Sequence, residues 1–167
     1  LLSLDSSTLT LCLGVLPWAD FQRAKGGVKV HVLLDHDDYM PSYALMTEAK
    51  QHDVRAARLL DLRPGSIVVM DRGYNDYGLF GRWCEAGVYF VTRLKSDAVY
   101  RIVETGPVPD GGNVLSDQLI ELDSIKGRRE CPHTLRRVVV WDEVNARPIV
   151  LVTNHLDFAA STIGRIY

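Results

Sequence analysis

Two aspartates stand at or within apolar segments, and their residue type suggests metal chemistry. Asp71 ends the apolar run Ile67 to Met70 in the stretch VVMDRGYND, and Asp5 lies in the opening segment LLSLD. A buried carboxylate is costly unless a positive charge compensates it, so a cation is expected beside Asp71. Mg2+ takes hard oxygen ligands, and two such ions can stabilise the attacking and leaving oxygens of a phosphoryl displacement. Asp5 and Asp71 are therefore candidate metal ligands, although Asp and Gly are also ordinary turn residues.

The segments that must position Asp5 begin with alternating apolar and polar residues. GVKVHVLLD places Lys29, His31 and Asp35 on one face of a strand, which is the period of two expected in a sheet. The polar turn DHDDYMP and the segment SYALMTEA complete an antiparallel pair. A helix follows in DVRAARLLDL, with Asp53 as its predicted N-cap.

The segments around Asp71 predict a parallel arrangement. SIVVM is a strand covered on both faces, YGLFGRWCEAG is a short helix closed by Gly87, and VYFVTRL is another strand. If the Asp71 strand lies parallel to the first strand, a right-handed crossover brings Asp5 close to Asp71. Ligands of open α/β sheets collect at such strand ends.

The last third of the sequence has a different pattern. Residues 97–148 contain a turn-rich stretch and two strands, SDQLIELDS and TLRRVVVW, joined by a basic stretch. The strand RPIVLVTN and a helix capped by Asp157 follow. We therefore predict one α/β domain over residues 1–167, a mixed sheet with flanking helices and an all-β insertion at 97–148.

Composition excludes several classes of protein. The chain has 167 residues, 47% of them hydrophobic, and a net charge of −2, so only a local basic patch could bind nucleic acid. Its three cysteines are scattered, which favours reduced thiols in a cytosolic protein over a disulfide framework or zinc site. No apolar run reaches the length of a membrane span.

Several motifs, in their order along the chain, resemble transposases of bacterial insertion sequences. These are SLDSST, FQRAKGGVKVHVLLD, HDVRAARLL, GSIVVMDRGYNDY, YFVTRLK, LRRVVVWD and LVTNHLDFAASTIGRIY. The resemblance is to the DDE group with a Y-x2-R-x3-E-x6-K signature, the insertion-sequence-four family. It implies a ribonuclease-H-like fold, two Mg2+ or Mn2+ ions, and cleavage and strand transfer at transposon ends. Asp5 matches the first catalytic carboxylate and Asp71 the second.

The same resemblance implies the setting of the reaction. The partners would be double-stranded DNA of the transposon ends and target, and a second copy in an active homodimer, in the bacterial cytoplasm. Tyr167 matches the signature Tyr, so the third carboxylate, a Glu, would lie beyond this sequence. The sequence is therefore expected to be an inactive piece of a longer transposase that also lacks the family's N-terminal DNA-binding segment.

Several side chains are candidates for binding DNA, each with a structural alternative. Phosphate contacts position a duplex without reading its sequence, and an aromatic ring can stack on an unpaired base. The alternatives are exposed strand faces and ends for the cations and core packing for the tryptophan. The candidates are Lys29, His31, Arg72, Arg93, Lys95, Arg136, Arg137 and Trp141.

Other residues favour structural roles. The turn of His36, Asp37 and Asp38 is expected to be solvated, and His52 is expected to start a helix. Trp18 and Trp83 are assigned to the core. Lys126, Arg128 and Arg129 join Arg136 and Arg137 in one basic concentration.

Two other functions fit these residues. One is a ribonuclease-H-like nuclease that cuts without strand transfer. The other is a catalytically dead remnant that binds DNA or a protein partner.

Overall fold

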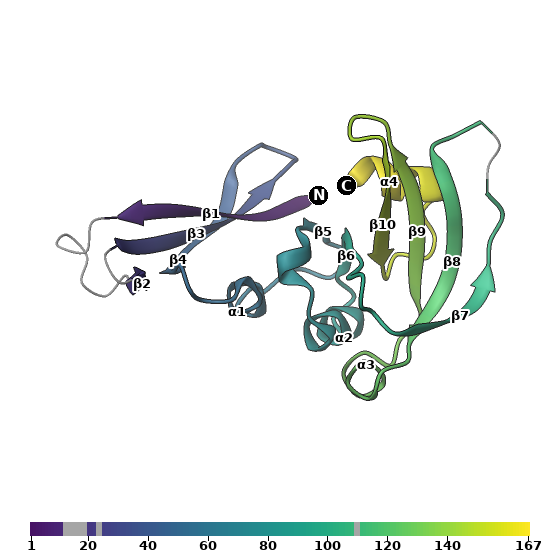
Figure 1. Cartoon of the computed structure of the whole chain (residues 1–167), viewed down its shortest axis with the longest axis horizontal. Helices are drawn as coiled ribbons and strands as arrows, with labels where there is room; N and C mark the ends of the chain where they lie inside the picture. The colour runs from purple at the N-terminus through teal and green to yellow at the C-terminus, as the bar shows by residue number, and fades with distance from the viewer. Residues whose placement is uncertain (12–19, 23–24, 109–110) are drawn as a thin grey trace. The chain divides into compact units, whose positions relative to one another are not determined.

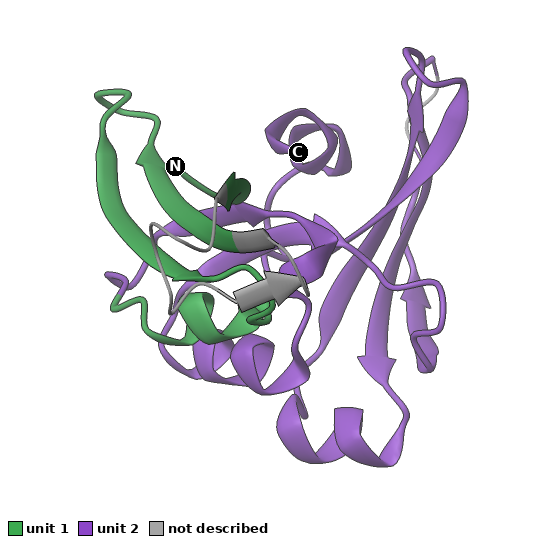
Figure 2. Cartoon of the chain, turned by 60° about the vertical axis from the view of Figure 1, so that its left-hand side comes forward, with its two compact units in different colours: residues 1–61 green, residues 62–167 purple. Residues whose placement is uncertain are grey.

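The computed structural model describes residues 1–11, 20–22, 25–108 and 111–167, in two compact units (Figure 2). The first unit is Leu1–Asp61 and the second is Leu62–Tyr167. Trp18, which we assigned to the core, lies outside the described residues. Each unit has its own sheet pairings, which are given separately below.

The first unit is an antiparallel sheet with one helix. Strand β3 (Lys25–Asp35) pairs antiparallel with β1 (Leu2–Leu11), with β4 (Pro41–Glu48) and with the short β2 (Asp20–Gln22). The alternating pattern thus predicted β3 and its hairpin with β4 correctly, and the turn at residues 36–38 is solvated as expected. The short strand β2 was not predicted.

Helix α1 (Asp53–Arg58) begins one residue earlier than predicted. His52 is its N-cap, and no side chain caps the helix. Asp53 instead accepts a hydrogen bond from Lys29 Nζ at 2.8 Å, so its carboxylate serves a tertiary contact. The prediction that Asp53 is the N-cap was therefore wrong.

The second unit is a mixed sheet in the order β5-β6-β10-β9-β8-β7 (Figure 1). Its strands are β5 (Ile67–Met70), β6 (Tyr89–Arg93), β7 (Tyr100–Thr105), β8 (Val114–Leu122), β9 (Leu135–Asp142) and β10 (Arg147–Thr153). Among the described residues of this unit, only β5 and β6 pair in parallel, and the other pairings are antiparallel. Helix α2 (Tyr77–Glu85) connects β5 to β6, as predicted, and Gly87 follows it with a φ of 65°.

The 97–148 region contains a helix as well as strands. Strands β7, β8 and β9 extend the sheet beyond β10, as expected for a β-rich region. Between β8 and β9 lies α3 (Ile125–Glu130), where Ser124 Oγ accepts the Gly127 N–H at 2.9 Å as an N-cap. The expectation of an all-β insertion was therefore incorrect at the basic stretch, and the strand β7 was not predicted.

The core of the second unit is apolar. Val91, Val138 and Leu151 are buried between the strands and helix α4 (Ala160–Ile166), whose Ile163 is also buried. Phe80 of α2 stacks on Phe90 of β6 with ring centroids 4.3 Å apart, and Trp83 is buried beside them, as predicted. Burial of such side chains is the main stabilising contribution to a fold of this size.

Helix α4 begins later than the sequence suggested. Its N-cap is Ala159, without a side-chain hydrogen bond, so Asp157 does not cap it. In the part of the chain that the structure describes, no helix is long and apolar enough to cross a membrane.

Candidate functional site

Asp71 lies at the carboxyl end of β5 and is exposed. Its Oδ1 accepts the Gly73 N–H at 2.7 Å, which makes Asp71 the N-cap of the 3-10 turn η1 (Arg72–Tyr74). Its Oδ2 has no hydrogen-bond partner among the described residues. The carboxylate is therefore oriented by the backbone and presents one oxygen outward, and the expected penalty for burial does not arise.

Asn75 ties the Asp71 turn to the neighbouring strand. This buried amide donates from Nδ2 to the carbonyl of Arg93 at 2.7 Å and to that of Arg72 at 3.2 Å. The main-chain carbonyl of Asn75 accepts from Lys95 Nζ at 3.1 Å. One side chain thus connects the residue after Asp71 with the end of β6.

Asp5 lies in the first unit, on β1. It is exposed and stands opposite Val32 of β3 in the ladder. Because Asp5 and Asp71 belong to different units, their meeting in one site stays a prediction. No cluster of three His, Cys, Asp or Glu residues that could hold a metal occurs in residues 1–11, 20–22, 25–108 and 111–167.

Lys29 and His31 share a face of β3, as predicted, but that face is covered. Lys29 Nζ lies 2.8 Å from Asp53 Oδ1 and 3.3 Å from the Gln51 carbonyl, and its side chain is only 15% exposed. His31 is buried and shares a hydrogen bond with Thr47 Oγ1 at 3.0 Å. Burial lowers the pKa of His31, which keeps the imidazole neutral near pH 7.

These contacts give both side chains a structural role. They attach α1 and β4 to the sheet, so the alternative of an exposed sheet face is wrong. The contacts also give no support to the suggestion that Lys29 or His31 binds DNA.

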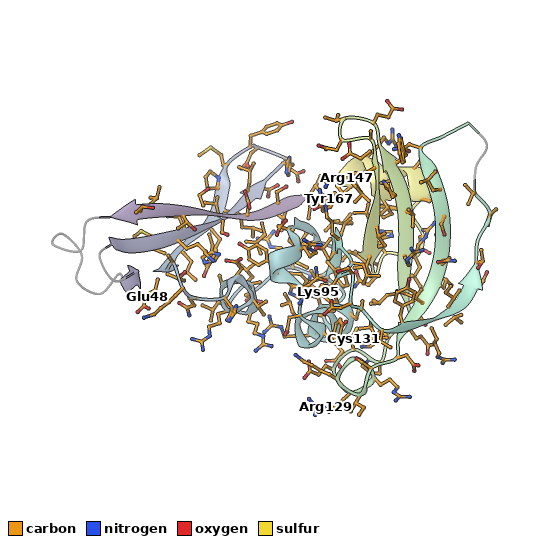
Figure 3. The ribbon with its side chains drawn as sticks, viewed as in Figure 1. Glu48, Lys95, Arg129, Cys131, Arg147 and Tyr167 are labelled. Atoms are coloured by element: carbon orange, nitrogen blue, oxygen red, sulfur yellow. The ribbon has the colours of Figure 1, made fainter. Side chains whose placement is uncertain are left out.

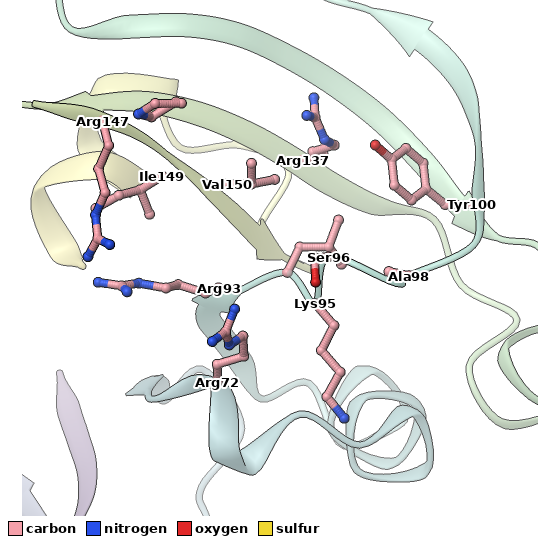
Figure 4. Close-up of a pocket in the computed structure, with 12 residues that line it drawn as sticks. Arg72, Arg93, Lys95, Ser96, Ala98, Tyr100, Arg137, Arg147, Ile149 and Val150 are labelled. Carbon is pink, nitrogen blue, oxygen red and sulfur yellow. The ribbon is translucent and has the colours of Figure 1, made fainter.

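A basic groove begins at Arg72, the residue that follows Asp71. It has a volume of about 420 Å3, and the cations that line it come from η1, β9, β10 and the end of β6 (Figure 4). None of the described Asp or Glu residues lines it. Five cationic side chains border it: Arg72, Arg93, Lys95, Arg137 and Arg147.

The cations of the basic groove form no salt bridge with any described residue. Asp142, the ladder partner of Arg147, is held instead by Asn145 Nδ2 at 2.7 Å and by the Val144 N–H at 3.1 Å. Like charges gathered without salt bridges repel one another, so an anion bound among them would be stabilised. The groove is therefore a candidate phosphate site.

Aromatic rings hold two of the groove arginines. The guanidinium of Arg93 lies 5.3 Å from the ring centroid of Tyr167, and that of Arg137 lies 5.8 Å from that of Tyr100. In Figure 4, Arg72, Arg93 and Arg147 gather at one end of the hollow, whereas Arg137 lies with Tyr100 at the other. Because Lys95 lies beyond the end of β6, it does not extend in the same direction as Arg93, contrary to the expectation from alternation.

Arg136 has a structural role, unlike the predicted phosphate contact. It is 8% exposed, and its Nε and Nη2 donate to the two carboxylate oxygens of Asp117, at 2.8 and 2.6 Å. Its Nη1 donates to the carbonyls of Leu156 and Phe158. The hydrogen bond to Asp117 raises the pKa of Arg136, and the occupied donors leave it unsuited to binding DNA.

The remaining aromatic and basic side chains are either partly exposed to solvent or paired with acidic residues. Trp141 is 39% exposed and lines a second hollow together with Tyr167, so it is not a core residue. Every cation of α3 has an acidic neighbour within 4.0 Å. The pairs are Lys126 with Asp76 and Glu130, Arg128 with Asp123, and Arg129 with Glu130.

Sequence reasoning missed Arg147, Tyr100 and the ring of Tyr167. Arg147 opens β10, whose pairing with β6 brings it to the groove. The only local signal was a cation at the start of a strongly apolar strand. Its place in the sheet follows from topology, which the local sequence does not encode.

The fold and the groove define a class of protein before any comparison. A mixed sheet with an exposed carboxylate at a strand end, beside unpaired cations, suits a protein that acts on phosphodiesters. Residues 1–167 match the transposase DDE domain family over their whole length, and the chain belongs to that family.

Two relatives carry transposase names. The y4zB protein of Sinorhizobium fredii is 31% identical over 154 residues, covering 90% of this chain and 43% of its own length. A protein of Geobacillus stearothermophilus, named as a transposase for insertion sequence element IS5377, is 29% identical and covers 98% of this chain. The chain spans 43% of the length of each relative.

A solved structure shares the fold. It is a cryo-EM structure of a piggyBac transposase synaptic complex with hairpin DNA, which matches with a TM-score of 0.55 and 13% identity. The match covers 95% of this chain and 34% of that one. At this identity the likeness concerns the fold alone.

Proposed function

We propose that this chain is the part of a DNA transposase that carries two of its catalytic carboxylates, Asp5 and Asp71, on a ribonuclease-H-like fold. The complete protein would cleave phosphodiester bonds at transposon ends and join them to target DNA. The observation that carries the proposal is the basic groove that begins at Arg72, directly after Asp71, whose five cations form no salt bridge with described residues. The family membership of the chain supports the same activity.

The two carboxylates fit a hard divalent cation. Both are exposed, and Asp71 keeps Oδ2 clear of hydrogen bonds to described residues while Gly73 fixes Oδ1. Carboxylate oxygens are the ligands that Mg2+ and Mn2+ prefer, and such ions would supply an activated oxygen nucleophile and charge neutralisation. The proposal requires Asp5 and Asp71 to lie within about 4 to 7 Å of each other. A structure of the metal-bound complete protein would test that requirement.

The chain's own residues position the DNA in this proposal. Arg72 follows Asp71 directly and Arg93 ends β6, the strand that pairs with β5, so they contact the phosphate next to the cleaved bond. Arg137 and Arg147 contact the backbone further along the groove, and Lys95 adds charge at its edge. Arginine suits this role because its planar guanidinium forms paired hydrogen bonds to phosphate.

The finer assignment follows the signature of the insertion-sequence-four group. We propose that Tyr167 is its first residue, followed in the coding sequence by an Arg, the catalytic Glu and a Lys. Reading the coding sequence beyond Tyr167 tests this directly. A homodimer that holds two transposon ends is part of the same proposal, and sedimentation with and without end DNA would test it.

The test of the catalytic assignment uses the complete protein encoded by the gene that contains this chain. Asp5→Asn and Asp71→Asn should each abolish Mg2+-dependent cleavage of transposon-end DNA while leaving DNA binding intact. Asp61→Asn, which changes an exposed aspartate, is the matched control and should cleave normally. Normal cleavage by either Asp5→Asn or Asp71→Asn would refute the assignment.

The products of the same reaction separate the two other functions. A nuclease without strand transfer would yield cut ends and no joined products when target DNA is supplied. A catalytically dead remnant would bind DNA and yield neither. Joined products that require Asp71 support the transposase.

The groove is tested by the salt dependence of DNA binding. Each phosphate contact that is lost should reduce the slope of log affinity against log salt by about 0.9. Arg147→Ala and Arg137→Ala should therefore lower the slope, and the effect should not depend on DNA sequence. Arg129→Ala is the control, because Arg129 lies on α3 and pairs with Glu130. If the slope is unchanged in both groove variants, the proposal that DNA binds in the groove is refuted.

A further inference from the structure

Two of the three cysteines meet in the second unit, far apart in the sequence. Cys84 lies in the last turn of α2 and is half-buried, and Cys131 follows α3 directly and is buried. Cys131 lies where α2 and α3 approach each other (Figure 3). Both are free thiols in the structure.

The backbones around the two cysteines are in close contact. A Cβ atom added at Gly81 of α2 would stand 2.1 Å from the Glu130 carbonyl oxygen and 3.4 Å from the Cys131 Cα. Cys84 lies one helical turn after Gly81, on the same side of α2, so its side chain faces the segment that carries Cys131. The absence of a side chain at Gly81 thus lets the backbone before Cys131 approach the side of α2 that carries Cys84.

The surroundings make the two thiols unequal. The hydrogen bond with Cys131 lowers the pKa of Cys84, and a second donor, Asn154 Nδ2, lies 3.5 Å from its Sγ. The same hydrogen bond, together with burial, raises the pKa of Cys131. A partly accessible thiol with thiolate character beside a buried second thiol is the arrangement of cysteines that react with oxidants.

We propose that Cys84 and Cys131 form a dithiol site that a low-molecular-weight disulfide, such as oxidised glutathione, converts into an internal disulfide. Cys84 is the attacking thiol and Cys131 is the resolving thiol. This site is separate from the Asp71 carboxylate and the basic groove, so it does not depend on the proposed function.

The reaction proceeds by two exchanges. The Cys84 thiolate attacks one sulfur of the small disulfide, its S–S bond breaks, and one small thiolate leaves and takes up a proton. Cys131 then loses its proton to solvent and its sulfur attacks Cys84, which releases the second small thiolate. In sum, two protein thiols are oxidised and one small disulfide is reduced to two thiols.

The disulfide would attach the end of α2 to the segment between α3 and β9. Helix α2 packs on the sheet beside β6, and α3 belongs to the 97–148 region. Oxidation would therefore join that region to α2 by a covalent bond. Motion of α3 against α2 would then be restrained. Slower amide exchange in α3 after oxidation should accompany bond formation.

The test is oxidation of the full chain by oxidised glutathione, followed by alkylation of the remaining thiols and peptide mass analysis. The expected product is one peptide pair joined through Cys84 and Cys131, formed in a variant that carries Cys12→Ser as well as in the unchanged chain. Mixed disulfides at Cys84 without any joined pair, or a joined pair that involves Cys12, would overturn the proposal.

Single variants assign the two roles. Cys131→Ala should accumulate the mixed disulfide at Cys84, whereas Cys84→Ser should leave Cys131 unmodified in the folded chain. Circular dichroism confirms that each variant is folded before it is oxidised. Equal modification of Cys131 with and without Cys84 would contradict the attacking role of Cys84, and the result for the unchanged chain stands even if a variant does not fold.

Discussion

The two units hold their helices to their sheets by different means. In the first unit, Lys29, His31 and Asp53 form a covered polar network between β3 and α1, and the buried side chains of α1 are the small Ala56 and Ala57. In the second unit, large apolar side chains such as Phe80 and Phe90 fill the space between helix and sheet. Each unit carries one of the two proposed catalytic carboxylates.

The difference shows which forces govern each proposed carboxylate. Asp5 rests on a sheet whose helix is attached by charge and hydrogen bonds, which weaken when a partner is neutralised. Asp71 rests on a sheet whose core is mainly apolar, so its stability depends less on charge. The second unit has one buried ion pair, Arg136 with Asp117, among its described residues, and it offers the sharpest test of that contrast.

The largest effect is expected from Arg136→Met. This change leaves the Asp117 carboxylate buried without its partner, and breaking such a pair costs about 3–5 kcal/mol of unfolding free energy. Urea unfolding of the variant measures the loss. The double variant Arg136→Met with Asp117→Leu should recover much of it, because no unpaired charge remains. A loss below about 1 kcal/mol in the single variant would show that the pair matters little to the second unit.

A smaller loss is expected from Gly81→Ala. The added Cβ would stand 2.1 Å from the Glu130 carbonyl oxygen, so α2 and α3 must move apart. Overpacking of this kind costs about 1–3 kcal/mol. Gly112→Ala is the control, since its nearest atom would be 4.0 Å away. Equal melting temperatures for the two variants would contradict the close contact.

Asp53→Asn tests the polar network of the first unit. The amide keeps the size of the carboxylate but removes its charge beside Lys29, so we expect a loss of about 1–2 kcal/mol. Hydrogen exchange of amides in β3 and β4 reports the effect within the first unit. Asp61→Asn, at an exposed position, should leave exchange unchanged. If exchange is also unchanged in Asp53→Asn, the network does not hold α1 to the sheet.

The smallest effect is a dependence on pH that both units share. Burial lowers the pKa of His31 and of His155, so the folded chain takes up protons at lower pH than the unfolded chain does. Stability is therefore full above about pH 6.5 and falls as the solution is acidified below it, by at most about 1.4 kcal/mol per pH unit for each histidine. Melting temperatures at pH 7.5 and 5.5 measure this fall. His31→Gln and His155→Gln should each reduce it, whereas His52→Gln, at an exposed position, should not.

The sequence predicted the strands and the long-range order of elements better than the ends of helices. Strong local patterns identified β3, β5, β6 and β10, and Gly87 marked the end of α2. Helix α3 escaped notice because six residues with a single cap carry too weak a pattern. Asp53 and Asp157 were misplaced as caps because both types also serve other contacts, and a local pattern does not distinguish them.

The candidate site was predicted only as far as its residues are local. Arg72 follows Asp71 directly, so both were found together, and Arg93 and Lys95 were found from a short motif. Arg136 and Arg137 are adjacent and have the same charge, yet Arg136 pairs with Asp117 whereas Arg137 lines the groove. Alternation along β9 sends them to opposite faces, and only the partners across the sheet decide which faces the hollow.

One buried amide described above sets a distance. Asn75 holds the carbonyls of Arg72 and Arg93 on a single nitrogen, so the strand end with Asp71 and the strand end with the groove cations keep a fixed separation. Arginine side chains can swing, but the two backbones to which they are attached cannot drift apart while this amide remains in place. Asn75 therefore fixes the distance between the Asp71 carboxylate and the backbone that carries the proposed phosphate-binding arginine Arg93. The spacing that a DNA strand would meet in this groove is set by a residue that need not touch the DNA.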